Sequence, residues 1–191
     1  PRTVSSAASD VYKRQLDDFG IDYIEGGWPG ANPTDDMFFS KDQKLNNAKL
    51  VAFGMTRRGG RSVENDPGLN AILNAKTDAT CLVGKTWDFH VTTALNIELD
   101  ENLRMITESV AAAKARGHES MFDCEHYFDG YKANPDYALS CVQAAHQGGA
   151  SWVILCDTNG GSLPDEVYEI VTATKKACLL YTSDAADETV R

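Results

Sequence analysis

Residues 152–161 (WVILCDTNGG) decide how the fold of this sequence is interpreted. The first half of the stretch is almost wholly apolar, which is typical of a strand buried on both faces of a parallel sheet. The second half brings an acid, a hydroxyl, an amide and two glycines to the point where that strand ends. Ligands of parallel α/β folds bind beyond the carboxyl ends of the strands. The stretch therefore predicts a buried strand with a polar site at its end.

Four apolar runs upstream end in the same way. Each gives way to charged, hydroxyl-bearing or glycine residues, as in IDYIEGG, KLVAFGMTRR, TCLVGKTWDFH and MFDCEH. One such ending is weak support for a site, whereas five at one sheet edge favour a polar site over a structural module. We expect the five strands over residues 21–25, 49–54, 80–84, 121–125 and 152–156.

Amphipathic stretches separate these runs. The clearest, residues 98–117, repeats apolar side chains at helical spacing and ends at Gly117. A helix is also expected over residues 34–46, with Thr34 as its N-cap. Further helices are expected over residues 67–75, 135–147 and 164–174.

Strands that alternate with helices predict repeated βα units and an α/β fold with a parallel sheet. No GxGxxG follows the first predicted strand, so a dinucleotide-binding Rossmann fold has no support. Five βα units fit either an open doubly wound sheet or part of a (β/α)8 barrel, and the pattern alone does not choose between them. The 191 residues are fewer than the roughly 250 of a typical complete barrel.

The composition excludes some function classes. A formal net charge of −10 argues against a nucleic-acid partner, because such surfaces need clustered lysine and arginine. No apolar run approaches the roughly 20 residues of a membrane span, and no secretory leader is recognisable. The five cysteines are widely spaced, which indicates reduced thiols rather than a disulfide or zinc framework. We therefore expect a cytoplasmic protein with no membrane partner.

The two ends of the sequence differ from its middle. Residues 1–15 (PRTVSSAASDVYKRQ) and 178–191 (CLLYTSDAADETVR) do not clearly continue the periodic pattern, and both resemble translated sequencing-adapter read-through. We expect them to be non-native and residues 16–177 to form the informative domain. The alternative is that they are genuine terminal segments, and no chemistry is assigned to them.

The residue types at the strand ends suggest a reaction class. The guanidinium groups of Arg57 and Arg58 can each bind a carboxylate in a bidentate manner. Glu125 and His90 can accept or donate protons. Thr158 can donate a hydrogen bond to a carboxylate or carbonyl oxygen.

Structural interpretations compete with these roles. An arginine in such a loop is more often a solvated surface charge. His126 is more often a hydrogen-bonded structural residue than a metal ligand, and strand neighbours such as Glu125 and His126 should point to opposite faces. Asp157 can cap the turn that follows it, and we expect His118 and His146 at the surface.

Six segments carry a family resemblance. They are FGIDYIEGGWPGANPTD, KLVAFGMTRRGG, VGKTWDFHVTTAL, ENLRMITESV, FDCEHYFDGYKANPDYAL and ILCDTNGGSLPDEV. In order and spacing they resemble the 2-isopropylmalate, homocitrate and citramalate synthases, an HMGL-like family of acyl-CoA condensing enzymes. The resemblance covers essentially all of residues 16–177. The motifs IEGGWPG and EHYFDGYKANP are most similar to the citramalate branch.

The resemblance implies a partial TIM (β/α)8 barrel over residues 16–177, with five of the eight βα units, from the second to the sixth strand. It implies a Claisen-type condensation of acetyl-CoA with a small 2-oxo acid, which is pyruvate in the citramalate branch and leads toward isoleucine. It also implies a divalent metal ion (Mg2+, Mn2+ or Zn2+) and a homodimer for the complete enzyme.

The resemblance also carries roles onto particular residues. Glu125 matches the catalytic glutamate of the family, and His90 matches a histidine of the catalytic site. Thr158 matches the threonine that holds the carboxylate of the oxo acid, with Asn159 beside it as a further substrate-binding residue. Glu25 and Arg57 match substrate-binding positions that line the pocket. The Arg-Asp and His-x-His motifs that bind metal in the family do not occur in this sequence, so no metal ligand is expected here.

Other functions stay open at this point. A 2-isopropylmalate or homocitrate synthase would share the chemistry and differ in the oxo acid. A metal-dependent aldolase or lyase of the same superfamily would cleave a C–C bond instead, and a barrel-derived binding module would lack catalysis. The isolated chain is expected to be inert and prone to aggregation, because part of the barrel is missing.

Overall fold

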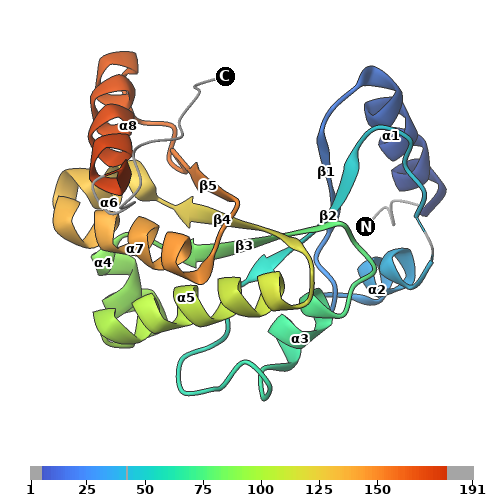
Figure 1. The fold of residues 1–191 in the computed structure, drawn as a ribbon, viewed down its shortest axis with the longest axis horizontal. Coiled ribbons are helices and arrows are strands. Elements are labelled where there is room, and N and C mark those ends of the chain that lie inside the picture. The colour runs from blue at the N-terminus through green and yellow to red at the C-terminus, as the bar shows by residue number, and fades with distance from the viewer. Residues whose placement is uncertain (1–5, 42, 180–191) are drawn as a thin grey trace.

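The computed structural model describes residues 6–41 and 43–179 (Figure 1). Its five strands form one sheet in the order β1-β2-β3-β4-β5, and every neighbouring pair is parallel. A doubly wound sheet reverses its strand order at a switch point, whereas the wall of a barrel keeps the chain order. The strict chain order therefore identifies the fold as part of a (β/α)8 barrel. The strands are β1 (Tyr23–Gly27), β2 (Lys49–Met55), β3 (Ala79–Lys85), β4 (Glu119–Glu125) and β5 (Trp152–Leu155).

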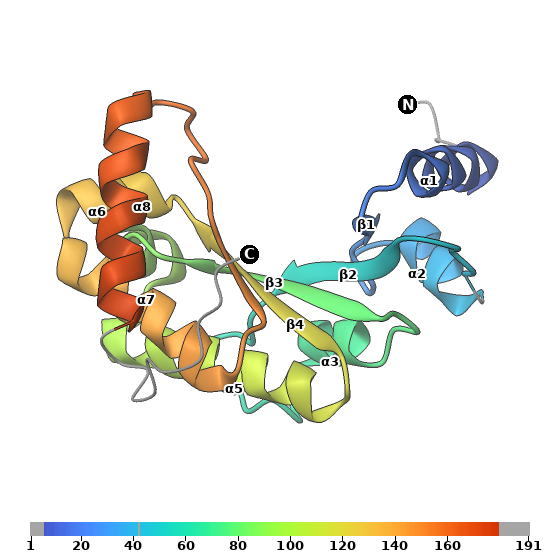
Figure 2. The same ribbon diagram turned by 45° about the horizontal axis from the view of Figure 1, so that its top comes forward.

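Helices follow each strand and lie on one side of the sheet (Figures 1 and 2). The longest, α5, packs against β3 and β4, and α7 packs against α5 and β5. Two short helices after β3 and one after β4 were not predicted, because the sequence indicated only polar residues at the ends of these strands. The helical elements are α1 (Ser6–Phe19), α2 (Pro33–Ser40), α3 (Pro67–Leu73), α4 (Asp88–His90), the π-helical η1 (Val91–Leu95), α5 (Leu99–Ala115), α6 (Tyr127–Ala133), α7 (Pro135–Gly148) and α8 (Pro164–Leu179).

The alternation of side chains along each strand creates two different faces. Leu50, Leu82 and Phe122 lie on the outer face, where they are buried in the main core beneath the helices. Cys81 and Met121 point the other way and belong to a smaller cluster on what we call the inner face of the sheet. In a closed barrel this inner face becomes the interior.

The helix predicted over residues 34–46 is shorter than expected, and Thr34 is not its N-cap. The side chain of Asn32 caps α2 by accepting hydrogen bonds from the backbone N–H groups of Thr34 and Asp35, both at 3.0 Å. The helix ends at Ser40, and the backbone of Lys41 is extended, with φ of −90° and ψ of 148°. Further along, Asp17 accepts hydrogen bonds from the backbone N–H groups of residues 46, 47 and 48, each at 2.8 Å.

Helix α1 crosses the boundary that the sequence suggested at residue 15. The helix continues without interruption from Ser6 to Phe19, and Lys13 and Asp17 on it are buried. The non-native origin of residues 1–15 and 178–191 stays a prediction. Residues 1–5 and 180–191 lie outside the described residues.

The exposed inner face predicts that the 191-residue chain aggregates when it is expressed by itself. Within the described residues, β1 and β5 are each paired on one side only, and Trp152 and Ile154 on β5 are 55% and 39% exposed. Unpaired strand edges and exposed apolar side chains promote association. We expect size-exclusion chromatography to show aggregates that bind a hydrophobic dye strongly. Ile154→Lys should reduce the dye signal, and a monodisperse wild-type chain with weak dye binding would contradict the prediction.

Candidate active site

The polar residues at the strand ends separate into three groups in the structure. His90, Glu125, Thr158 and Asn159 lie around the carboxyl ends of β3, β4 and β5 and are connected by contacts through His126 and Asp129. Glu25 lies lower on the inner face, near Asp123. Arg57 faces the helices instead.

Glu125 is the last residue of β4 and lies directly opposite Lys85, the last residue of β3. The Lys85 Nζ donates to Glu125 Oε2 at 2.5 Å, and both side chains are largely shielded from solvent. The backbone of Glu125 is fixed by Thr86, whose N–H and hydroxyl both donate to the Glu125 carbonyl oxygen at 3.2 and 2.8 Å. From the sequence, a proton-transfer role was predicted for Glu125 and no role was predicted for Lys85.

His90 belongs to a group of aromatic rings beside this ion pair. Its ring centroid lies 4.7 Å from that of Trp87 and 4.5 Å from that of His126. Burial lowers the pKa of His90, and the nearby His126 and Lys85 lower it further. His90 is therefore largely neutral at pH 7, which lets its ring both donate and accept a hydrogen bond.

Thr158 and Asn159 reach the site from the turn after β5. The Thr158 hydroxyl oxygen accepts a hydrogen bond from the backbone N–H of His126 at 2.8 Å, which leaves the hydroxyl proton available for donation. His126 has a left-handed backbone with φ of 58°, so the chain turns sharply after Glu125. The Asn159 amide donates to Asp129 Oδ2 at 2.9 Å.

The structural interpretations made from the sequence have mixed outcomes. His126 lies 3.4 Å from Asp129 through Nδ1, which agrees with a hydrogen-bonded structural role. Asp157 accepts a hydrogen bond from the Ser162 N–H at 3.1 Å and so caps its turn as expected. His146 is exposed, as predicted. His118 is not simply at the surface, because it is half-buried and its Nδ1 lies 2.7 Å from the hydroxyl of Thr80.

The side chain of Arg57 pairs with two carboxylates of a helix. It is only 4% exposed and lies 2.7 Å from Glu101 and 2.6 Å from Glu108 on α5. The backbone N–H of Arg57 donates to the hydroxyl of Ser109 on the same helix. The expectation of a solvated surface charge is wrong for Arg57, since the group is buried. Its predicted substrate-binding role stays a prediction.

The Arg57–Glu101 pair makes stability depend on pH. The hydrogen bond from Arg57 lowers the pKa of Glu101 to about 2, with smaller contributions from Arg104 and the Gly60 N–H. A carboxyl group with a depressed native pKa stabilises the fold above its unfolded pKa of about 4.3, and this stabilisation is lost as the pH falls toward 2. We expect the melting temperature of the complete protein to fall over this range. Glu101→Gln should flatten the fall, and an equally steep profile in that variant would contradict the prediction.

Glu25, Cys81 and Asp123 form a cluster on the inner face, with ligand atoms within 4.8 Å of one another. Desolvation raises the pKa of Glu25, the charge of Asp123 adds to it, and burial raises the pKa of Asp123 and of the Cys81 thiol. Mg2+ and Mn2+ select ionised oxygen ligands, so this donor set with its buried thiol does not fit them. The sequence interpretation missed Asp123, although the two-residue period from Glu125 places both on one face.

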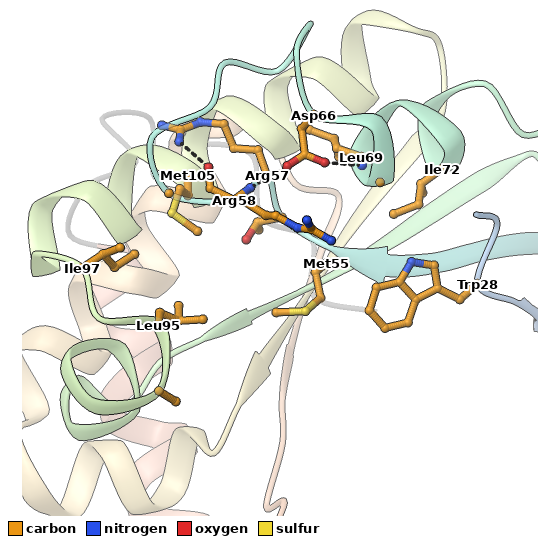
Figure 3. A pocket seen from close by; sticks show the side chains of 14 residues that line it. Trp28, Met55, Arg57, Arg58, Asp66, Leu69, Ile72, Leu95, Ile97 and Met105 are labelled. Carbon is orange, nitrogen blue, oxygen red and sulfur yellow. Dashed lines mark hydrogen bonds between the residues drawn. The ribbon is translucent and has the colours of Figure 1, made fainter. Parts of the chain in front are cut away.

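An apolar cavity of about 440 Å³ adjoins the carboxyl edge of the sheet (Figure 3). Trp28 lies on one side of it, and Leu95 and Ile97 lie on the other. Arg57 and Arg58 both line this cavity, but only Arg58 is exposed, and its backbone N–H donates to Asp66 at 2.8 Å. The predicted carboxylate-binding role of Arg58 stays a prediction.

The parallel sheet in chain order, with ionisable groups gathered at its carboxyl edge, defines a TIM-barrel enzyme class. The HMGL-like family matches residues 2–185, and the chain belongs to this family. None of the helices within residues 6–41 and 43–179 combines the length and apolar character needed to cross a bilayer.

The relatives in sequence carry two names. An (R)-citramalate synthase of Aquifex aeolicus is 56% identical over 164 residues, which are 85% of this chain and 31% of that protein. One of Synechocystis sp. is 48% identical over 86% of this chain and 30% of its own length. A 2-isopropylmalate synthase of Bradyrhizobium sp. is 28% identical over 81% of this chain and 28% of its own length. The chain thus spans about a third of the length of the relatives it matches.

Solved structures confirm the fold. The HMG-CoA lyase of Bacillus subtilis superposes with a TM-score of 0.74 over 92% of this chain and 59% of the lyase. The sequence identity is 16%, so this likeness concerns the fold alone. It confirms the expectation of a partial barrel.

Proposed function

We propose that the complete protein condenses acetyl-CoA with pyruvate and water to give (R)-citramalate and CoA. One observation carries the proposal. Glu125, His90 and Thr158 meet at the carboxyl edge of a sheet whose sequence is 56% identical to a relative named (R)-citramalate synthase. The 2-isopropylmalate synthase relative, at 28% identity, is the second candidate and would use a larger oxo acid.

The proposed chemistry begins with a proton transfer. The Glu125 carboxylate removes a proton from the methyl group of acetyl-CoA, and the C–H electron pair becomes the enolate. The enolate carbon then bonds to the carbonyl carbon of pyruvate, and water hydrolyses the thioester and releases CoA. The ring N–H of His90 can donate a hydrogen bond to the developing alkoxide, and the proton that Glu125 has removed passes to that oxygen to form the hydroxyl group. Atoms balance without an oxidant or a reductant.

Substrate orientation is assigned to the turn after β5. The Thr158 hydroxyl, anchored as an acceptor by the His126 N–H, keeps its proton for the carboxylate of pyruvate. Asn159 holds Asp129 and so fixes the shape of this rim. Glu25 would line the lower part of the pocket, next to Asp123.

A divalent cation, Mg2+ or Mn2+ with Zn2+ as a further candidate, would polarise the carbonyl of the oxo acid when bound. Because the described clusters do not fit Mg2+ or Mn2+, we assign the metal ligands to segments outside this chain. The proposal also includes a homodimer and a cytoplasmic location for the complete protein.

The test is free-thiol release from acetyl-CoA by the complete protein with Mg2+ or Mn2+. Pyruvate, 2-oxoisovalerate and 2-oxoglutarate are compared as acceptors. The fastest release with pyruvate supports the proposal. Faster release with 2-oxoisovalerate would move the protein to the 2-isopropylmalate synthases. No release from folded, metal-loaded protein would favour a lyase or a non-catalytic module.

A further inference from the structure

The pair formed by Lys85 and Glu125 has an unusually well-defined geometry. The two residues end adjacent strands and are register partners, so their side chains leave the inner face of the sheet side by side. The Lys85 Nζ reaches Glu125 Oε2 at 2.5 Å, with side-chain exposures of 19% and 27%. Among the described residues no group donates to Oε1, so the carboxylate keeps one free oxygen.

Both partners are anchored through their backbones. The carbonyl oxygen of Lys85 accepts a hydrogen bond from the Asn102 amide at 2.9 Å, and Asn102 is completely buried on α5. The carbonyl oxygen of Glu125 accepts two hydrogen bonds from Thr86, which is also completely buried. A surface ion pair costs side-chain freedom and contributes little, but here the strand ends are already fixed. The geometry of the pair is therefore set before substrate binds.

The surrounding charges leave Lys85 as the cation for Glu125. His90 on α4 is held largely neutral, and His126 lies against Asp129 at the start of α6. From the strands, Asp123 on β4 and Glu25 on β1 contribute carboxyl groups, and the Cys156 thiol after β5 has a raised pKa through burial. Within the described part of the chain, Lys85 is the cation that forms an ion pair with Glu125.

We propose that Lys85 is a positioning residue that holds the Glu125 carboxylate through Oε2, so that Oε1 acts as the base. The inference rests on the proposed function. A general base must lie within hydrogen-bond reach of the proton it removes, and Oε1 is the oxygen that the lysine leaves free. In the step itself the methyl proton passes to Oε1, the C–H electron pair becomes the enolate, and the Lys85 ammonium keeps its three protons.

The experiment uses the complete protein and the variants Lys85→Met, Lys85→Gln and Lys85→Arg. The kcat with pyruvate is expected to fall about tenfold or more in the Met and Gln variants while both KM values stay near the wild-type values, because a displaced base weakens the transition state and not substrate binding. Lys85→Arg keeps a cation at Oε2 and should recover most of the lost kcat. An unchanged kcat in both neutral variants, or an equal loss in Lys85→Arg, overturns the proposal.

A second readout does not depend on catalysis. Crystal structures of the complete protein and of its Lys85 variants give the side-chain conformation of Glu125. The carboxylate is expected to leave its wild-type position in Lys85→Met and Lys85→Gln and to keep it in Lys85→Arg. A displaced carboxylate in a protein without condensation activity would support the pair and refute the proposed function. A carboxylate that stays in place in both neutral variants refutes the pair whatever the activity.

Discussion

Glu125→Gln is expected to lower kcat about 1,000-fold in the complete protein, because a positioned general base contributes roughly 100- to 10,000-fold. The substitution keeps the size of the side chain and removes the carboxylate that takes the methyl proton. The hydrogen bonds from Thr86 go to the backbone of Glu125, so they survive the change. The KM values for both substrates should change little, since the lost interaction belongs to the transition state.

The measurement is thiol release at saturating acetyl-CoA and pyruvate, with the melting temperature as a check of folding. Glu169→Gln is the matched control, because Glu169 is an exposed residue of α8 far along the chain from the strand ends. It should retain wild-type kcat. A Glu125→Gln protein with more than about a tenth of wild-type kcat would show that another group is the base.

Thr158→Val is expected to lower kcat/KM for pyruvate by about 10- to 100-fold, as a hydrogen bond to a charged group contributes about 1.5–3 kcal/mol. Valine has nearly the shape of threonine and lacks the hydroxyl that would bind the carboxylate. The same change removes the acceptor of the His126 N–H, which lies 2.8 Å away. Most of the loss should therefore appear as a raised KM for pyruvate, while the KM for acetyl-CoA stays near its wild-type value.

Two companion variants separate substrate binding from local structure. Thr158→Ser retains the hydroxyl and should recover most of the lost kcat/KM. Thr172→Val changes an exposed threonine on α8 and should have no effect. The assignment fails if Thr158→Ser is as impaired as Thr158→Val, or if the two KM values rise together.

The strands could be predicted from sequence because an almost wholly apolar run that ends in polar residues is a strong local signal. The burial expected on both faces is wrong for β5, because Trp152 is 55% and Ile154 39% exposed. The run WVILC and the four similar runs each correspond to a strand, with ends that differ by one or two residues. The order of the strands could not be predicted in this way, since five βα units satisfy a barrel and an open sheet equally well. The hydrogen-bonded register supplied that information.

The site was only partly predictable, for a physical reason. A strand end indicates which residues reach the edge, so Glu125 and Thr158 could be found. It does not indicate partners that come from elsewhere in the chain. Arg57 appeared to be a free cation until Glu101 and Glu108 on α5 were seen to bind it.

The same limit applies to the contacts of Asp17 and to those of Glu125. Asp17 lies 29 to 31 residues from the backbone groups that it binds, so no local pattern reveals these hydrogen bonds. Lys85 and Glu125 are 40 residues apart. Their pairing follows only from the strand register, because Lys85↔Glu125 is the last pair between β3 and β4.

We propose that the carboxyl edge of this sheet, in the complete protein, forms a carbon–carbon bond between acetyl-CoA and pyruvate. The most direct measurement is 13C NMR of the products formed by the complete protein from methyl-labelled acetyl-CoA and unlabelled pyruvate. We expect labelled citramalate with the wild type and none above background with Glu125→Gln. Labelled citramalate at the wild-type rate from Glu125→Gln, or none from folded, metal-loaded wild type, would contradict it.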